Sequence, residues 1–319
     1  MKPSTTSSSE LHAHRVGDAV HNHIEQGRNP RVLAGSLVLT LSFAGVELVA
    51  GLWSNSLALI SDAGHMVTDS SALALALLAR SIARHPPSPT HSFGFGRAEA
   101  LAAFVNALTM VLIVGWIAFE AIDRLSNPRE VKGEAVILVA LIGMVVNLLV
   151  AWLLTHDEKS LNTRAAMIHV LGDLLASVAA LAAGVVIYFS GWLPIDPLLS
   201  LLVSMLILAS TLRVLRDSYH FLMEGVPREI DYLQVGADLK AVEGVLSVHD
   251  LHIWEMTPGR PALIGHVEIA ELRQWPTVLA AIKTMLMERH GIDHITLQAE
   301  LPGMAAKRSA TACSPPARP

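Results

Sequence analysis

The chain has 319 residues, of which 52% are hydrophobic and only 16% are charged. A soluble globular protein usually has about 25% charged residues, and the mean hydropathy is +0.47, so most of this chain does not have the composition of a water-soluble domain. The formal charge of −5 gives no reason to expect nucleic-acid binding. The single cysteine, Cys313, excludes a disulfide within one chain.

Residues 1–30 are polar and rich in Ser, Thr and His, without the apolar core of a signal peptide. We expect a flexible cytoplasmic tail that stays in the mature protein. Its four spaced histidines are His12, His14, His21 and His23. Such residues can bind zinc weakly in a flexible chain, and a solvated tail without metal is an equally good interpretation.

Residues 31–220 hold six apolar stretches, each near the roughly 20 residues that a helix needs to cross the hydrocarbon core. The expected spans are 32–53, 57–83, 98–122, 135–155, 161–190 and 194–215. Only Ser54, Asn55 and Ser56 separate the first two, which predicts an antiparallel hairpin. The sequence therefore predicts an α-helical membrane protein with six transmembrane helices in contact with lipid.

Basic residues indicate the orientation of the spans. An even number of spans places both termini on one side, and that side carries Arg28, Arg31, Arg80, Arg84, Arg97, Lys159, Arg164, Arg213 and Arg216. The other side has only Arg124, Arg129 and Lys132, close to several acidic residues. The positive-inside rule then predicts that both termini are cytoplasmic.

Residues 221–301 read as a small cytoplasmic α+β domain of order αββαβ. Residues 228–242 have the pattern of an amphipathic helix, and two alternating stretches, 246–256 and 262–270, are separated by Pro258 and Gly259 as expected for a hairpin. A helix over 275–289 and a strand over 295–300 complete the domain. Residues 302–319 are rich in Ala, Ser and Pro, which predicts a disordered tail.

Ionisable side chains inside the apolar spans are the strongest functional signal, because they are costly in a membrane. The second span carries His65 and Asp69, and the fifth carries His169 and Asp173. In each pair the residues are four positions apart and share one helix face. If the two faces oppose each other, two imidazoles and two carboxylates surround one point.

Such a set of two nitrogen and two oxygen ligands suits Zn²⁺, and also Co²⁺ or Cd²⁺, whereas Mg²⁺ and Ca²⁺ prefer sites built of oxygen ligands. Asp62 lies one turn before His65 and can support a ligand, line the ion path or act as a helix-end charge. Glu47 in the first span is either structural or on the ion path. Asn106 and Asn147 are expected to hydrogen-bond between helices.

Six features stand out in chain order: SLALISDAGHMVTD (56–69), HSFGFGRAE (91–99), the pair His169 and Asp173, LMEGVP (222–227), VHDLHIW (248–254) and HITLQAE (294–300). Together they resemble the cation diffusion facilitator, or zinc transporter, family. The resemblance implies a bacterial, homodimeric, proton-coupled metal exporter of the cell (inner) membrane, with a metallochaperone-like cytoplasmic domain. It also implies that the chain is not an enzyme.

At the positions that match the family's motifs, the resemblance implies a transport site formed by His65, Asp69, His169 and Asp173. Zinc-type members have His first in both pairs, as here, whereas manganese-type members have Asp. Some members bind a second metal in the loop after the second span. Here His91 is kept, but Ser88 and Phe95 replace the other two ligands, so no such site is expected; His85 could substitute only with a different geometry.

In the cytoplasmic domain the resemblance points to a partial zinc site formed by His249, His266 and Glu300, with His294 as a further candidate. Where some members have a later ligand, this chain has Gln298. The strand pattern alone does not establish that these side chains converge, so a structural role is an equal alternative. Zn²⁺ is thus expected as the transported ion, with a regulatory ion in this domain as a second hypothesis.

The ligand types suggest exchange with protons, because metals bind neutral imidazole and ionised carboxylate and so displace protons. Two other classes of protein use similar residues. An intramembrane metalloenzyme would need an open metal position and a general base, and the chain has no His-Glu-x-x-His run. A passive channel would favour several weak sites along a pore rather than one compact set.

Overall fold

The computed structural model describes the backbone of residues 30–155 and 161–302, and the side chains of residues 38–150, 152 and 171–302. The predicted tails, with the four N-terminal histidines, lie outside the described residues. So does the side chain of His169, although its backbone is part of a described helix.

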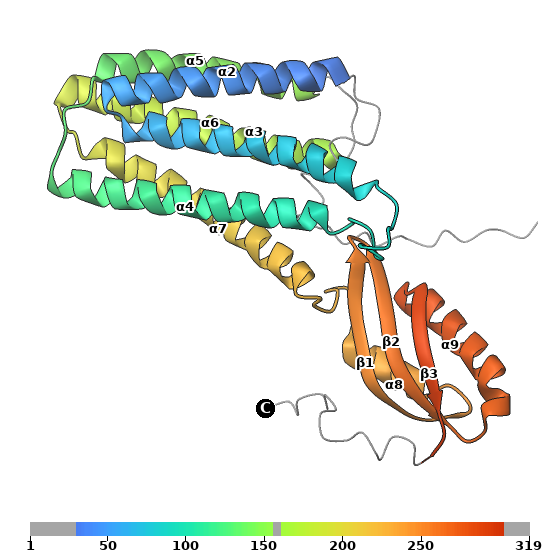
Figure 1. Ribbon diagram of the computed structural model, residues 1–319. Coiled ribbons are helices and arrows are strands. Elements are labelled where there is room, and N and C mark those ends of the chain that lie inside the picture. Colours follow the sequence, from blue (N-terminus) through green and yellow to red (C-terminus); the bar gives the residue numbers. More distant parts are fainter. Residues whose placement is uncertain (1–29, 156–160, 303–319) are drawn as a thin grey trace, which may run out of the picture. The chain divides into compact units, whose positions relative to one another are not determined.

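Six long helices form the membrane domain, which confirms the predicted class (Figure 1). They are α2 (Pro30–Ser54), α3 (Leu57–Ala83), α4 (Ala98–Ser126), α5 (Gly133–Thr155), α6 (Leu161–Ser190) and α7 (Ile195–Leu222). Five of them are long and apolar enough over their described residues to cross a membrane, and α2 contributes a shorter apolar stretch, Val38–Ser54. The last helix runs seven residues beyond the predicted end at Leu215.

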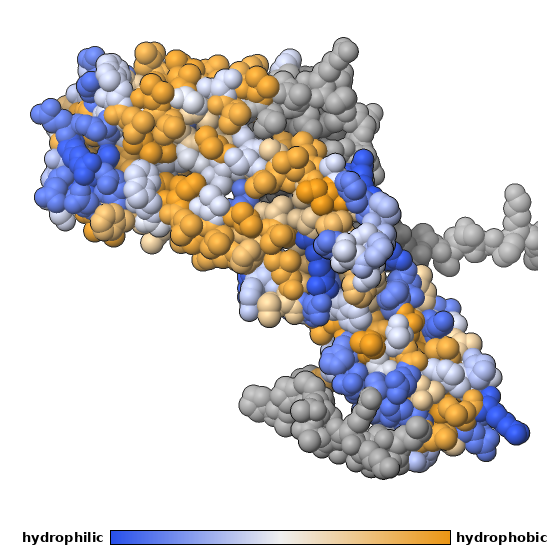
Figure 2. Space-filling view, in the orientation of Figure 1, coloured by the Kyte–Doolittle hydropathy of each residue, from blue (hydrophilic) through white to orange (hydrophobic). Residues whose placement is uncertain are grey.

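The helices pack through small side chains and present large apolar ones outward. One core cluster joins α2, α3, α5 and α6, and its members include Phe43, Ala44, Met66, Ala140 and Ala180. Small residues let helix backbones approach closely where lipid supplies no hydrophobic drive between helices. Large apolar side chains on the outer faces stay exposed, and Figure 2 shows them as broad orange areas over the helices, as expected for surfaces that contact lipid.

The short turn between α2 and α3 is anchored by a residue that the sequence analysis did not single out. Asp196, at the start of α7, is fully buried. Its carboxylate accepts hydrogen bonds from the Ser56 hydroxyl at 2.6 Å and from the backbone amides of Leu57 at 2.6 Å and Ala58 at 3.3 Å. An acidic group at a helix N-terminus satisfies amides that have no partner within the helix, so Asp196 fixes the start of α3.

Three basic residues near the ends of the helices, Arg124, Arg129 and Lys132, are engaged in local contacts. Arg124 is buried, donates to the Asn55 carbonyl and forms an ion pair with Glu120 at 3.0 Å. Arg129 also contacts Glu120, at 2.9 Å. The Lys132 ammonium lies 4.0 Å from the centre of the Trp53 ring. All three positive charges therefore have a structural role at this end of the helices.

The C-terminal domain has the predicted αββαβ order: α8 (Tyr232–Lys240), β1 (Val245–Thr257), β2 (Arg260–Ile269), α9 (Trp275–His290) and β3 (His294–Glu300). The sheet order is β1-β2-β3, with β1 and β2 antiparallel and β2 and β3 parallel. The core between sheet and helices contains Val235, Leu239, Leu251, Ile253, Leu263, Val267, Ile269, Val278, Ile282, Leu286 and Ile292.

The predicted start of the first helix in this domain, Arg228, is wrong by four residues. Asp231 is the N-cap of α8, and its side chain accepts from the amides of Leu233 and Gln234. Asp is one of the preferred N-cap residues, because its oxygen satisfies an amide that the helix leaves free. The cap therefore sets the start of the helix, and the amphipathic pattern begins earlier than the helix does.

Candidate metal centres

The second and fifth predicted spans bring three of the four expected ligands together. The Nε2 atom of His65 lies 3.4 Å from Oδ2 of Asp69 and 3.5 Å from Oδ1 of Asp173. One potential ligand atom from each residue lies within 4.8 Å of the others. His65 and Asp69 are one turn apart on α3, whereas Asp173 comes from α6. Packing of α3 and α6 therefore brings together three of the four residues in the two i, i+4 pairs.

His169 lies on α6, four residues before Asp173. Residues four apart share a helix face, so its position is compatible with the fourth ligand of the set. Its side chain lies outside the described residues, and its assignment stays a prediction.

Two further carboxylates are buried in the membrane domain. Glu47 on α2 has an exposed fraction of 0% and Asp62 on α3 of 2%. The Ser177 hydroxyl, on α6, is 3.5 Å from Oδ2 of Asp62 and accepts a hydrogen bond of 3.0 Å from the Asn147 amide on α5. The interhelical role predicted for Asn147 thus has a specific partner, which only the packing could reveal.

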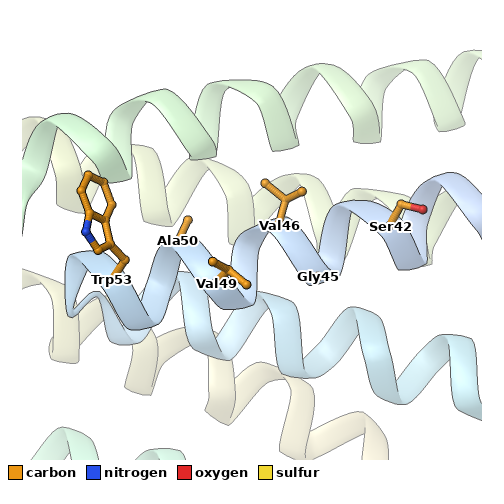
Figure 3. A pocket seen from close by; sticks show the side chains of 6 residues that line it. All are labelled: Ser42, Gly45, Val46, Val49, Ala50 and Trp53. Atoms are coloured by element: carbon orange, nitrogen blue, oxygen red, sulfur yellow. The ribbon is translucent and has the colours of Figure 1, made fainter.

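An apolar groove on α2 is separate from these polar groups. It has a volume of about 560 Å³ and is lined by Ser42, Gly45, Val46, Val49, Ala50 and Trp53 (Figure 3). None of these residues carries a charge or a strong metal ligand. The groove is therefore a feature of the apolar surface and not a candidate ion site.

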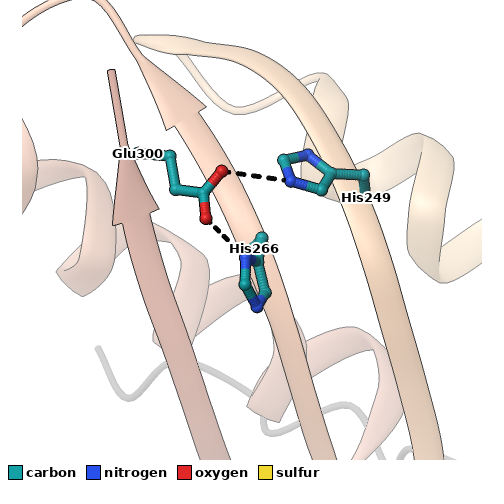
Figure 4. Close-up of side chains that lie close together, drawn as sticks. All are labelled: His249, His266 and Glu300. Carbon is teal, nitrogen blue, oxygen red and sulfur yellow. Dashed lines mark hydrogen bonds and ion pairs between the residues drawn. The ribbon is translucent and has the colours of Figure 1, made fainter. Parts of the chain in front are cut away.

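The cytoplasmic domain contains a second cluster, made by His249, His266 and Glu300 (Figure 4). Glu300 Oε1 lies 2.6 Å from Nδ1 of His266, and Oε2 lies 3.2 Å from Nε2 of His249. Strand register explains the convergence. His249 on β1 pairs with His266 on β2, and Glu300 on β3 is two residues beyond the partner of His266, so it points to the same side of the sheet.

The neighbouring groups favour the ionised form of Glu300. Burial disfavours the charged form of Glu300, but the hydrogen bond to His266 and the two neighbouring imidazoles outweigh it, so the pKa of Glu300 lies below its usual value. The Gln298 amide also donates to Glu300, at 3.0 Å. The negative carboxylate between two imidazoles is a suitable arrangement for a divalent ion.

Asp250 belongs to the same neighbourhood and was missed from the sequence. It has a positive φ of 51°, and the register of β1 shifts between His249 and His252, as in a β-bulge. Its Oδ2 lies 3.7 Å from Nε2 of His266. Strict alternation would send adjacent residues to opposite faces, so the sequence pattern alone gave no reason to group Asp250 with His249.

His294 is not part of this cluster. It is exposed and pairs with Ala262, whereas Gln298 pairs with His266. Four residues along a strand correspond to about 13 Å. The structure therefore limits the cluster within one chain to the other three predicted residues, with Asp250 beside them.

The loop between α3 and α4 is held by contacts that need no metal. Ser88 and His91 form a pair of backbone hydrogen bonds, each 3.0 Å long. The ring of His91 lies 4.4 Å from that of Phe95, centre to centre. His85 bonds through Nδ1 to the carbonyls of Ser81 and Ile82. These contacts hold the loop without a metal, and the absence of the second metal site stays a prediction.

The Ser88→Ala and Phe95→Ala variants are therefore expected to keep zinc uptake within about twofold of the parent, the usual range for surface substitutions. Uptake into inverted vesicles and bound zinc per purified chain are the measurements. Phe93→Ala, at an exposed aromatic residue of the same loop, is the control for loss of a ring. Loss of one bound ion in a well-folded Ser88→Ala or Phe95→Ala protein would contradict the expectation.

Comparison with known proteins adds the family. The model described as the cation efflux transmembrane domain matches residues 33–223, and that of the cation efflux protein cytoplasmic domain matches residues 227–301. Zinc transporter ZitB of Escherichia coli is 43% identical over 282 residues, covering 88% of this chain and 90% of the relative. ZitB of Pectobacterium atrosepticum is 42% identical over 284 residues and covers 88% of both chains.

Two further relatives broaden this set. The cadmium, cobalt and zinc/H(+)-K(+) antiporter of Bacillus subtilis is 41% identical over 286 residues, covering 88% of this chain and 91% of the relative. A solved metal-bound C-terminal domain of the CzcD transporter from Cupriavidus metallidurans is 38% identical, with a TM-score of 0.22, and covers 23% of this chain and all of that one. With both family models matched in order and relatives above 40% identity along most of its length, the chain belongs to the cation efflux family of transporters.

Proposed function

We propose that this chain exports Zn²⁺ from the cytoplasm in exchange for protons, with His65, Asp69, His169 and Asp173 as the transport site. The convergence of His65, Asp69 and Asp173 within 4.8 Å, from two helices of the membrane domain, carries the proposal. Relatives named as zinc transporters, and one named as an antiporter that uses H⁺, support it.

The ligand types favour zinc. Two imidazoles and two carboxylates form a closed tetrahedral set, and the two carboxylates balance the two charges of the ion. A neutral complex is far less costly to hold in a membrane domain than an unbalanced charge. Mn²⁺, Mg²⁺ and Ca²⁺ favour oxygen ligands and fit this set less well.

Protons and metal compete for the same atoms, and this competition couples their movements. When the site opens to the cytoplasm, its groups lose protons and bind Zn²⁺; when it opens to a more acidic compartment, protons displace the ion. Because His65 and Asp69 lie on α3 and Asp173 on α6, a relative movement of these helices changes access and ligand geometry together.

Zinc accumulation in sealed inverted vesicles tests the function. The parent chain is expected to concentrate zinc against its gradient when the vesicle interior is acidic, and to lose that ability when an ionophore abolishes the pH gradient. A passive channel would only equilibrate zinc, and an enzyme would move none. Either of those two results contradicts proton-coupled export.

We place the chain in the inner membrane of a bacterium, among lipids, with both termini in the cytoplasm and two chains in a homodimer. The unequal distribution of basic residues supports the orientation, since the three on the other side have local partners. A match to the cytoplasmic domain of this family supports pairing of chains. No part of the proposal involves nucleic acid. Zinc binding by the N-terminal histidines stays a prediction.

A regulatory zinc site in the cytoplasmic domain is the second part of the proposal. The ligands are His249, His266 and Glu300, one from each strand of the sheet. An ion there would join three strands of a small domain, and small domains are only marginally stable. Bound zinc would therefore stabilise the sheet on which these residues lie.

The isolated fragment 225–301 contains its own hydrophobic core and is expected to unfold at a higher temperature with zinc than without. At a free metal concentration 100 times the dissociation constant, the stabilisation is about 2.7 kcal/mol, which corresponds to roughly 10–20 °C for a domain of this size. The His249→Ala/His266→Ala double variant should lose this shift. His294→Ala should keep it, because His294 lies outside the cluster. A parent fragment whose midpoint ignores zinc would remove the regulatory site and leave the membrane site untouched.

A further inference from the structure

Glu47 and Asp62 are two buried acids of the membrane domain that the proposed transport site does not use and that, unlike Asp196, do not cap a helix. Both carboxylate oxygens of Glu47, and Oδ1 of Asp62, are buried without a hydrogen-bond partner among the described residues. Neither group forms an ion pair with a basic residue in that part of the chain. A native protein rarely leaves such groups unsatisfied without a ligand or a function.

Protonation of Glu47 would not give its carboxyl group a hydrogen-bond partner among the described residues. A neutral carboxylic acid has an O–H that needs an acceptor, and among the described residues no hydrogen-bond partner lies near either oxygen of Glu47. An ionised carboxylate in the same place needs positive charge. In both states the described residues leave this group unsatisfied, and a small ligand would complete its surroundings.

Residues on α5 and α6 surround the two buried carboxylates. A side chain at Gly143 of α5 would begin 2.9 Å from the Phe43 ring and 3.0 Å from Oε1 of Glu47, so glycine makes room for both the ring and the carboxylate. Asn147 and Ser177 form a hydrogen-bonded chain that leads to the other oxygen of Asp62. Four helices thus contribute to a polar region around the two acids: Glu47 from α2, Asp62 from α3, and one or two groups from each of α5 and α6.

A small cavity adds further oxygen atoms beside Asp62. It is lined by Ser61, Asp62 and Ser200 together with apolar residues, and its volume of about 10 Å³ is close to that needed for one water molecule. Ser61 also contacts Ser204 on α7, at 3.4 Å. Among the described residues, the metal ligands that line this neighbourhood are therefore carboxylate and hydroxyl oxygens.

The region lies one helical turn away from the proposed transport site, on the side where α3 begins. Asp62 precedes His65 by three residues, and Ser177 follows Asp173 by four on the antiparallel α6, so both are displaced by about 5 Å in the same direction. Glu47 lies within electrostatic range of both Asp62 and Asp173. In the proposed orientation this is the non-cytoplasmic side, towards which an exported ion must move.

Charge balance makes a divalent ion the fitting ligand. The carboxylates of Asp69 and Asp173 already neutralise one Zn²⁺ at the transport site. Glu47 and Asp62 add two negative charges, which a second position for one divalent ion would balance. Oxygen ligands hold Zn²⁺ less tightly than a set that includes imidazoles, and a weak position suits an ion that is about to leave.

We propose that Glu47 and Asp62 form a second, oxygen-lined position for the divalent ion, which the metal occupies on its way from the transport site to the non-cytoplasmic side. The inference rests on the proposed export function and adds a release step to it. Both acids are then direct metal contacts, and Ser177 and Asn147 position Asp62.

Zinc binding to the purified full-length protein tests the position directly. Equilibrium dialysis with radioactive Zn²⁺, extended to saturation, is expected to show one bound ion fewer per chain in Glu47→Gln and in Asp62→Asn than in the parent. The lost ion should be the one that binds with low affinity in the parent. Glu120→Gln is the matched control, because this acid of the same domain is paired with Arg124 and Arg129. If Glu47→Gln is not monodisperse, Asp62→Asn provides the count.

Transport provides the second measurement. In inverted vesicles Glu47→Gln is expected to lower the maximal zinc uptake roughly tenfold, in the range found for residues that support a metal site, while the zinc concentration at half-maximal uptake changes little. A release position acts after zinc has bound to the transport site. Its loss should therefore lower the maximal rate and leave the zinc concentration at half-maximal uptake nearly unchanged. The same number of bound ions in the parent, Glu47→Gln and Asp62→Asn would overturn the proposal and leave only water or protons at these acids. The export function itself would survive that result, because it depends on Asp173.

Discussion

Asp173→Ala is expected to abolish proton-driven zinc uptake into inverted vesicles. The substitution removes a ligand and also one of the two charges that balance the metal. Loss of a group that merely supports a ligand already costs about 10–100-fold in metal affinity or activity, so loss of the ligand should reduce uptake by at least about 100-fold. Initial rates at saturating zinc, with an imposed pH gradient, are the measurement.

Asp123→Ala is the matched control for this experiment. Asp123 is an acid of the same domain, half-buried near the C-terminal end of α4 and paired with Arg129, and it is not one of the clustered residues. Its variant should transport at a rate near that of the parent. If Asp173→Ala transported equally well while correctly inserted, the transport site proposed here would be wrong, whatever the cytoplasmic domain does.

His65→Asp is expected to change which ion is preferred. Replacing an imidazole by a carboxylate gives the site three oxygen ligands, which favours harder ions such as Mn²⁺ and weakens the hold on Zn²⁺. Mn²⁺ should then compete with zinc uptake about tenfold more effectively than in the parent, a shift of the size associated with altered metal surroundings. Competition of each ion with a fixed zinc concentration gives the ranking.

The control variant is His85→Asp, which makes the same change in an exposed loop where the ring contacts only backbone carbonyls. It should keep the ranking of the parent. An unchanged ranking in His65→Asp as well would show that His65 does not touch the ion, even though its Nε2 lies within 3.5 Å of Asp173.

Local patterns in the sequence determined much of this fold. Helix α3 was predicted with both ends correct, because a continuous apolar run between the Ser54–Ser56 turn and the loop at Arg84 leaves few alternatives. The i, i+4 pair of His65 and Asp69 also followed from helix geometry alone, since it depends only on the residues of one helix. Alternation gave the strands β1 and β2 to within two residues of each end.

Contacts between distant segments could be established only by the tertiary structure. Asp196 binds the start of α3 from 139 residues away, and no local pattern marks it as a cap for another helix. Asp250 joins the cytoplasmic cluster because a bulge interrupts β1, and His294 leaves it because of where it falls in the register of β3. The physical reason is the same in each case. Periodicity places a side chain on a face of its own element, whereas the partner that this face meets depends on how whole helices and strands pack.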